Sequence, residues 1–112
     1  MQQICTDLKK QYQEFDDLVA GLDEKQWCRK TPFFEWTIFD EVAHIAFFDH
    51  EALLTIENPS LFRERAVKVM KIVREASHWP KHFNAMLGIN DPVELLKDWR
   101  TCRKKLLDRL IR

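Results

Sequence analysis

Apolar side chains recur at three- and four-residue steps along four long stretches of the chain, as on one face of an α-helix. Between these stretches lie residues that commonly begin or end helices, such as proline, glycine and aspartate. No alternating strand pattern and no internal repeat is present. The sequence therefore predicts one all-α domain, residues 1–112, folded as an up-and-down helical bundle with helices over 2–20, 38–56, 61–76 and 92–111.

Capping residues set the expected helix boundaries. Thr37 followed by Asp40 forms a potential capping box, in which each side chain satisfies a free backbone N–H at the helix start. Pro59 stops that helix, and Asp91 before a proline is a typical start for the last one. The sequence His-Trp-Pro at 78–80 is expected to break the third helix and to begin a connector.

The second predicted helix carries polar residues within a very apolar stretch, WTIFDEVAHIAFFDHEA at 36–52. On a helical wheel they form one narrow stripe, which consists of Asp40, His44, Glu51 and Thr55. The stripe has two interpretations. It can be the solvent-facing strip of a largely buried helix, with Asp40 and His44 paired one turn apart, or it can belong to a functional site.

Asp49 lies instead in the middle of the apolar arc of this helix, with His50 at the margin of the arc. A buried carboxylate needs hydrogen-bond or charge partners to offset its lost hydration. A tryptophan N–H or an arginine is a more common partner than a metal ion. We therefore predict a structural partner for Asp49 and keep metal binding as the alternative.

Composition places the chain among globular proteins, with 46% apolar and 32% charged residues in 112. No apolar run reaches the roughly 18 residues of a membrane span. The first ten residues, MQQICTDLKK, contain no apolar signal-peptide segment, so a cytoplasmic location is expected. Cys5, Cys28 and Cys102 are widely spaced and odd in number, which indicates free thiols and no zinc-finger pattern.

Charge is distributed unevenly, although the formal net charge is zero. Residues 1–56 hold 11 acidic and 5 basic side chains and residues 57–112 hold 7 and 13, so the two halves carry −6 and +6. A nucleic-acid surface in the basic half is one interpretation. We do not expect it, because six of these 13 basic residues lie in RTCRKKLLDRLIR at 100–112, where cations suit the helix C-terminus and no aromatic side chains are interleaved to stack on bases.

Residues 21–54 resemble the DinB-like superfamily, and within it the mycothiol-dependent maleylpyruvate isomerase type. The resemblance continues more weakly along nearly the whole chain. The shared elements are a G-L turn with a following tryptophan, a T-P pair and a W-T-I-x-D-x-V-A-H-I-A run, here Gly21, Leu22, Trp27, Thr31, Pro32, Trp36, Thr37, Ile38, Asp40, Val42, Ala43, His44, Ile45 and Ala46. The resemblance implies a four-helix bundle with a divalent-metal site, zinc or nickel, in which His44 is the first ligand.

Two more ligands in such proteins normally come from a later helix, as His or Glu followed by His four positions on. An open coordination position then polarises a small thiol or water. The last segment here, TCRKKLLDRLIR, contains no such pair, so the bundle is expected to be incomplete. His78 and His82 have this spacing, but Pro80 between them disturbs a continuous helix. We therefore predict weak or no zinc or nickel binding by this chain alone.

Three functional hypotheses follow from these residues. The first is a metal-binding domain, related to thiol-dependent transferases and isomerases, with an incomplete site, either as the N-terminal part of a longer protein or as a shortened relative that retains His44. It predicts that His44 lies near Asp40 at a groove. The second is an enzyme in which His44 shares a metal ion with one of three other residues, His78, His82 or Asp49.

The third hypothesis is a non-catalytic interaction domain that self-associates. Without a further long helix, the second helix and part of the last one would expose an apolar patch that includes Phe39, Phe47 and Phe48. A symmetric homodimer is the simplest way to cover such a patch, because each copy presents the same surface to the other. This hypothesis is compatible with the first.

Overall fold

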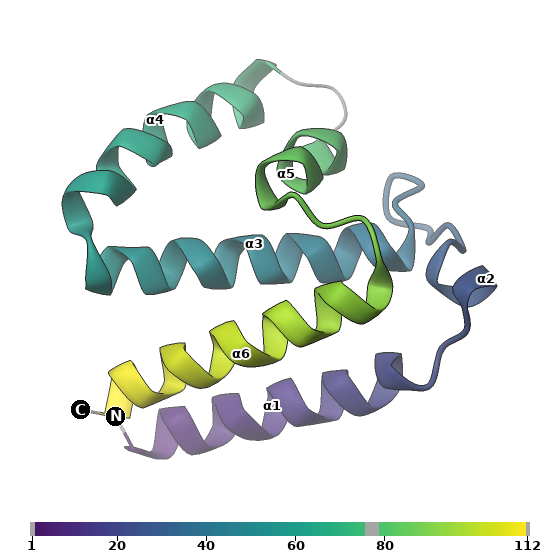
Figure 1. Cartoon of the computed structure of the whole chain (residues 1–112), viewed down its shortest axis with the longest axis horizontal. Helices are drawn as coiled ribbons and strands as arrows, with labels where there is room; N and C mark the ends of the chain where they lie inside the picture. Colours follow the sequence, from purple (N-terminus) through teal and green to yellow (C-terminus); the bar gives the residue numbers. More distant parts are fainter. Residues whose placement is uncertain (1, 76–78, 112) are drawn as a thin grey trace.

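The computed structural model of the chain describes residues 2–75 and 79–111 (Figure 1). No strand forms within these ranges, and one isolated bridge joins Lys30 and Thr37. The all-α bundle expected from the sequence is confirmed. The helices in chain order are α1 Gln2–Ala20, α2 Glu24–Trp27, α3 Ile38–Glu57, α4 Pro59–Glu75, α5 Trp79–Leu87 and α6 Pro92–Ile111.

Helix α3 is the centre of the bundle, because it packs against α2, α4, α5 and α6. Figure 1 shows α1, α6 and α3 lying side by side, with α5 across α3 and α4 diverging from it. The main core cluster joins the four elements α1, α2, α3 and α6. Its buried members are Val19, Trp27, Val42, Ala43, Ala46, Leu95, Leu96 and Trp99.

The predicted capping box at Thr37 forms as a pair of hydrogen bonds, and the start of α2 has a second box that was not predicted. Thr37 Oγ1 accepts from the Asp40 N–H at 3.0 Å, and Asp40 Oδ2 accepts from the Thr37 N–H at 3.1 Å. Asp23 and Gln26 make the same reciprocal pair at the start of α2. The hydrogen bonds between Thr37 and Asp40 fix the first turn of α3, which comes one turn before His44.

The prediction of a connector after residue 78 is wrong, because Trp79–Leu87 forms helix α5. Pro80 lies in the first turn of α5, where the missing proline N–H removes no intrahelical bond. The helix ends before Gly88, whose φ of +75° is a conformation that glycine adopts without strain. His78 lies outside the described residues, so the His78–His82 pair is not placed as a pair.

The third long helix also begins earlier than predicted, at Pro59 instead of residue 61. Asn58 Oδ1 accepts from the Leu61 N–H at 3.2 Å and caps this helix. Pro59 therefore ends α3 and also occupies the first position of α4, where proline is favoured. Within the described ranges, no helix is both long and apolar enough to cross a membrane.

Candidate functional site around His44

His44 lies on the second turn of α3, one turn after Asp40, but the two side chains do not form the expected pair. Asp40 Oδ2 is occupied by the capping box, and Asp40 Oδ1 accepts from Asn84 Nδ2 at 2.9 Å. Asn84 belongs to α5, so this hydrogen bond joins α5 to the start of α3. The interpretation of Asp40 and His44 as an i,i+4 pair on a solvent-facing strip is wrong.

The imidazole of His44 is surrounded by aromatic rings. Its ring centroid lies 5.4 Å from that of Trp36, 4.8 Å from Phe48 and 5.9 Å from Phe83. Nδ1 is buried and has no hydrogen-bond partner among the described residues. Burial lowers the pKa of His44 below its ordinary value of 6.5. The ring is therefore neutral at pH 7, which is the form that binds metal ions.

A surface pocket of about 360 Å³ opens beside His44. Its walls are largely aromatic and come from α1, the loop before α3, α3 itself and α5. The lining residues are Phe15, Phe33, Trp36, Glu41, His44, Ile45 and Trp79. Glu41 is the carboxylate among the described residues that line the pocket, and Glu41 Oε1 accepts from Thr31 Oγ1 at 3.2 Å. The predicted concavity at His44 is present and contains both an imidazole and a carboxylate.

The pocket fits part of a metal-ligand set. A buried imidazole nitrogen without a partner calls for an explanation, and a nearby carboxylate is a second donor of the kind that zinc accepts. Three or more His, Cys, Asp or Glu side chains do not come together at a possible metal position anywhere in residues 2–75 or 79–111. His82 is exposed on α5 and does not line this pocket. The pocket therefore supplies His44 and Glu41 as candidate ligands.

Comparison with known proteins identifies the family of this chain. The sequence of residues 8–112 matches the family described as "Mycothiol maleylpyruvate isomerase N-terminal domain". This chain belongs to that family. It is part of the DinB-like superfamily that the W-T-I-x-D-x-V-A-H-I-A run resembles. No solved structure gives a significant match.

Two matching relatives are the "Uncharacterized protein MT0041" of Mycobacterium tuberculosis strain CDC 1551 / Oshkosh and the "Uncharacterized protein Rv0036c" of strain ATCC 25618 / H37Rv. Each is 30% identical to this chain over 109 residues. The match covers 94% of this chain and 40% of each relative. The chain therefore spans less than half the length of these relatives.

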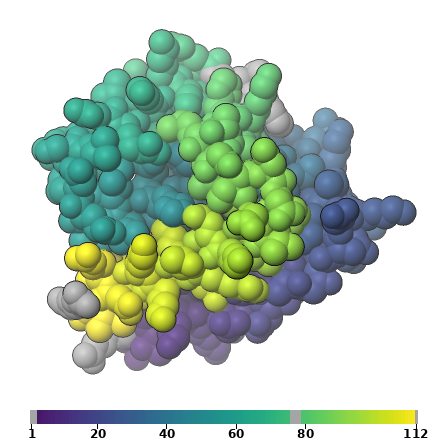
Figure 2. Space-filling model, in the orientation of Figure 1, coloured from purple at the N-terminus to yellow at the C-terminus, as the bar shows by residue number. Residues whose placement is uncertain are grey.

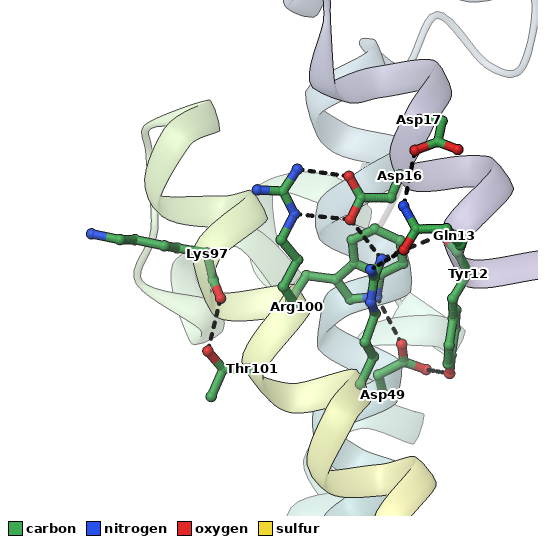
Figure 3. A network of polar contacts seen from close by, with 10 residues as sticks. Tyr12, Gln13, Asp16, Asp17, Asp49, Lys97, Arg100 and Thr101 are labelled. Atoms are coloured by element: carbon green, nitrogen blue, oxygen red, sulfur yellow. Dashed lines mark hydrogen bonds and ion pairs between the residues drawn. The ribbon is translucent and has the colours of Figure 1, made fainter. Parts of the chain in front are cut away.

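Asp49 has a structural role in this domain, as predicted (Figure 3). Trp99 Nε1 donates to Asp49 Oδ2 at 2.9 Å, and Tyr12 Oη donates to Asp49 Oδ1 at 3.0 Å. Burial raises the pKa of Asp49, and these two hydrogen bonds oppose the rise. The tryptophan partner was one of the two expected kinds. Asp49 therefore joins α1, α3 and α6 and does not contribute to the His44 pocket.

Asp16 on α1 is a buried carboxylate that was not predicted from the sequence. Arg100 holds it with two hydrogen bonds of 2.7 and 2.8 Å, and Arg103 Nη1 lies 2.8 Å from Asp16 Oδ2 (Figure 3). The hydrogen bonds from Arg100 lower the pKa of Asp16. A signal was available, because Asp16 lies between Tyr12 and Val19 on the apolar face of α1. A carboxylate on such a face predicts an arginine on the neighbouring helix.

In the rest of the polar stripe of α3, Glu51 faces another helix, whereas Thr55 is exposed to solvent. Glu51 is only 5% exposed, and its Oε1 accepts from Arg65 Nε and Nη2 at 2.9 and 2.6 Å. His50 Nε2 lies 2.6 Å from Asp98 Oδ2 of α6. A second pocket, of about 320 Å³, in the hollow between α4, α5 and α6 (Figure 2), is lined by Glu51, Arg65, His50 and Asp98.

Because burial lowers the pKa of His44, we predict a loss of stability on acidification. The unfolded chain takes up a proton at His44 near pH 6.5, whereas the folded domain does so only at lower pH. The free energy of unfolding should therefore fall as the pH drops below about 6.5 and level off below the folded-state pKa. Urea unfolding between pH 7.5 and pH 5 is the measurement. His44→Phe should flatten this dependence, and His82→Ala, at an exposed histidine, should leave it unchanged.

Proposed function

We propose that this domain binds a divalent metal ion, zinc or nickel, through His44, and that one copy of the chain holds the ion weakly. The observation that carries the proposal is the position of His44. It occupies the histidine position of the family motif, its ring is neutral and lacks a hydrogen bond at buried Nδ1, and it lines an open pocket. Glu41 in the same pocket is the second candidate ligand.

Two physical arguments support this role. Metal binding requires a deprotonated imidazole, and burial already favours that form of His44 at neutral pH. Aromatic walls exclude water from around a bound ion, which strengthens its interaction with a neighbouring carboxylate. A divalent ion with an open coordination position supplies Lewis-acid chemistry towards a thiol or water. As an enzyme, the domain would therefore catalyse a reaction of a small thiol in this pocket.

A metal titration tests the proposal. The protein should be purified without a metal-affinity column, stripped with a chelator and titrated with zinc or nickel in a calorimeter. We expect weak binding that becomes more than about tenfold weaker in His44→Phe, because phenylalanine keeps the aromatic packing and removes the ligand. His82→Ala is the matched control and should bind like the wild type. Equal binding by all three proteins would contradict the proposal.

A second candidate function is self-association without catalysis. Two exposed apolar side chains favour it, since Phe48 is 39% and Met70 48% exposed beside an apolar pocket of about 350 Å³ between α3 and α4. The predicted homodimer relied on an apolar patch that includes Phe47, and this residue is not exposed. Phe47 is 1% exposed, because α5 places Phe83 against it with ring centroids 4.8 Å apart. A cytoplasmic location fits the three free cysteines and remains part of this proposal.

A further inference from the structure

We infer that the pocket beside His44 binds a small organic cation that carries a methylated ammonium group. Aromatic rings around such a group form a recognition site, because the electron-rich faces of the rings attract the positive charge. The inference goes beyond the proposed function and does not depend on metal binding, since it assigns a ligand to the pocket walls. Among the described residues, the aromatic side chains that line the pocket are Phe15, Phe33, Trp36 and Trp79, which we call the aromatic cage.

The rings of the aromatic cage come from three separate parts of the fold. Phe15 belongs to α1, Phe33 and Trp36 to the loop before α3, and Trp79 begins α5. The rings of Phe33 and Trp36 stand at 89° to each other with centroids 5.0 Å apart. Two rings at right angles form a corner, which a compact cation can contact from two sides. Tryptophan gives the strongest interactions of this kind, and the volume of about 360 Å³ suits a small ligand.

Glu41 places a negative charge in this pocket that the protein does not balance. Among the described residues that line the pocket there is no lysine or arginine, and Glu41 forms no salt bridge within residues 2–75 and 79–111. Its hydrogen bond from Thr31 comes from a neutral hydroxyl. A ligand that covers the carboxylate removes part of its hydration, which costs free energy unless a positive charge or a donor replaces the water. A cation therefore fits this pocket better than a neutral apolar molecule.

The pocket walls favour a methylated ammonium over a primary one. A primary ammonium has several N–H donors, and each needs an acceptor when it leaves water. The faces of aromatic rings accept hydrogen bonds only weakly. Methyl groups on the nitrogen replace these donors by apolar surface, which packs against the rings while the positive charge stays. The ligand class is therefore a quaternary or highly methylated amine.

The turn at the pocket mouth holds Phe33 in place before a ligand arrives. Phe34 and Glu35 have φ values of 49° and 60°, which non-glycine residues rarely adopt. Hydrogen bonds fix this turn, since the Trp36 N–H donates to the Phe33 carbonyl at 2.9 Å and the Thr31 N–H donates to the Trp36 carbonyl at 2.7 Å. Backbone strain of this kind is common at functional sites. The ring of Phe33 is 50% exposed and can therefore cover a ligand from the solvent side.

A proton NMR titration with choline tests the inference on the untagged full chain after chelation. Ring currents should shift the trimethylammonium signal upfield, which shows that this group lies over aromatic rings. Choline should bind more than about tenfold more tightly than its neutral carbon isostere, in which a tert-butyl group replaces the trimethylammonium group. Ethanolamine, which carries a primary ammonium on the same carbon chain, should bind at least about threefold more weakly than choline.

Three variants assign the binding to particular side chains. Glu41→Gln keeps the shape and the acceptor for Thr31 but removes the charge, so choline binding should weaken more than about fivefold. Phe33→Leu keeps an apolar side chain and removes the ring, which should weaken binding about threefold or more. Phe34→Leu is the matched control, because this neighbouring ring is 78% exposed and does not line the pocket. It should bind choline like the wild type, and circular dichroism confirms that each variant is folded.

His44→Phe separates this inference from the proposed metal site. Phenylalanine keeps an aromatic ring and removes the metal ligand, so this variant should lose zinc and retain choline. Loss of choline by the folded variant would overturn the inference. Equal binding of choline and its neutral isostere would also overturn it, as would equal binding of ethanolamine, unchanged binding by Glu41→Gln, or no choline binding at all. None of these results touches the metal proposal. A protein that binds choline but no zinc would support the inference and overturn the proposed function.

Discussion

Replacing Trp99 by alanine is expected to lower the free energy of unfolding by about 3–5 kcal/mol, as for other fully buried tryptophans. Trp99 is 0% exposed, and its ring meets those of Tyr12 and Phe15 edge-on with centroids 5.8 and 5.7 Å away. The Arg103 guanidinium lies over the ring, 4.6 Å from its centroid. The substitution therefore removes contacts to α1 and α6 and one of the two hydrogen bonds of Asp49. Urea unfolding at pH 7 measures the loss.

Two further variants separate the causes of this loss. Trp99→Phe keeps much of the apolar volume but removes the indole N–H donor to Asp49, so it should cost about 1–3 kcal/mol. Val93→Ala on the same helix changes a side chain that is 67% exposed and should cost less than about 0.5 kcal/mol. A loss for Trp99→Ala as small as that for Val93→Ala would contradict the packing of α6 against α1 and α3.

The long helices could be predicted from the sequence because local signals dominate their formation. The apolar period of α6, with Leu95, Trp99, Cys102 and Leu106 buried, is visible without any tertiary information. The capping box at Thr37 is local as well, since its two hydrogen bonds join residues three positions apart. Elements whose start, end and buried face are encoded within a few residues are those that the pattern predicts correctly.

Helix α5 could not be predicted in the same way. It is short, its start coincides with Pro80, and a proline after a long helix normally marks a break. A nine-residue helix is not stable by itself, so α5 depends on packing against α3. The contacts responsible are those of Phe83 with Phe47 and of Asn84 with Asp40, which span 36 and 44 positions. Contacts between such distant positions produce no periodic pattern of apolar residues in either segment.

Of the two interpretations of the polar stripe of α3, the solvent-facing strip fails at Glu51 for a related reason. A helical wheel shows which residues share a face but not what covers that face. The position of Glu51 looked like a solvent-facing one, yet Arg65 of α4 covers it and accounts for its burial. Asp49 was easier, because its position among apolar residues made a buried partner necessary in any arrangement.

The candidate site shows the same division between local and distant information. The motif placed His44 correctly on α3, and a concavity was expected beside it. The pocket walls, however, come from positions as far apart as Phe15 and Trp79, which only the fold brings together. Glu41 was not singled out in the sequence, although its spacing of three from His44 was a usable signal. Its importance becomes visible only when both residues are seen to line one pocket.

Removing the aromatic ring of Phe83 is expected to detach α5 and to change His44 at the same time. Phe83 is 1% exposed and stacks on Phe47, so Phe83→Ala should cost about 3–5 kcal/mol of unfolding free energy. The ring also lies 5.9 Å from that of His44 and contributes to the burial that lowers the pKa of His44. With this ring gone, the pKa of His44 should rise towards its ordinary value of 6.5.

Two measurements on the same variant check these expectations together. Urea unfolding gives the loss of stability, and a proton NMR titration of the histidine rings gives the pKa of His44. Phe34→Ala is the matched control, because it removes the same side chain at a position that is 78% exposed and should change neither quantity. If Phe83→Ala destabilises the protein but leaves the pKa of His44 unchanged, burial by α5 is not what lowers that pKa. If neither quantity changes, α5 does not pack on α3 through Phe83, and the pocket wall that it supplies must be assigned to another segment.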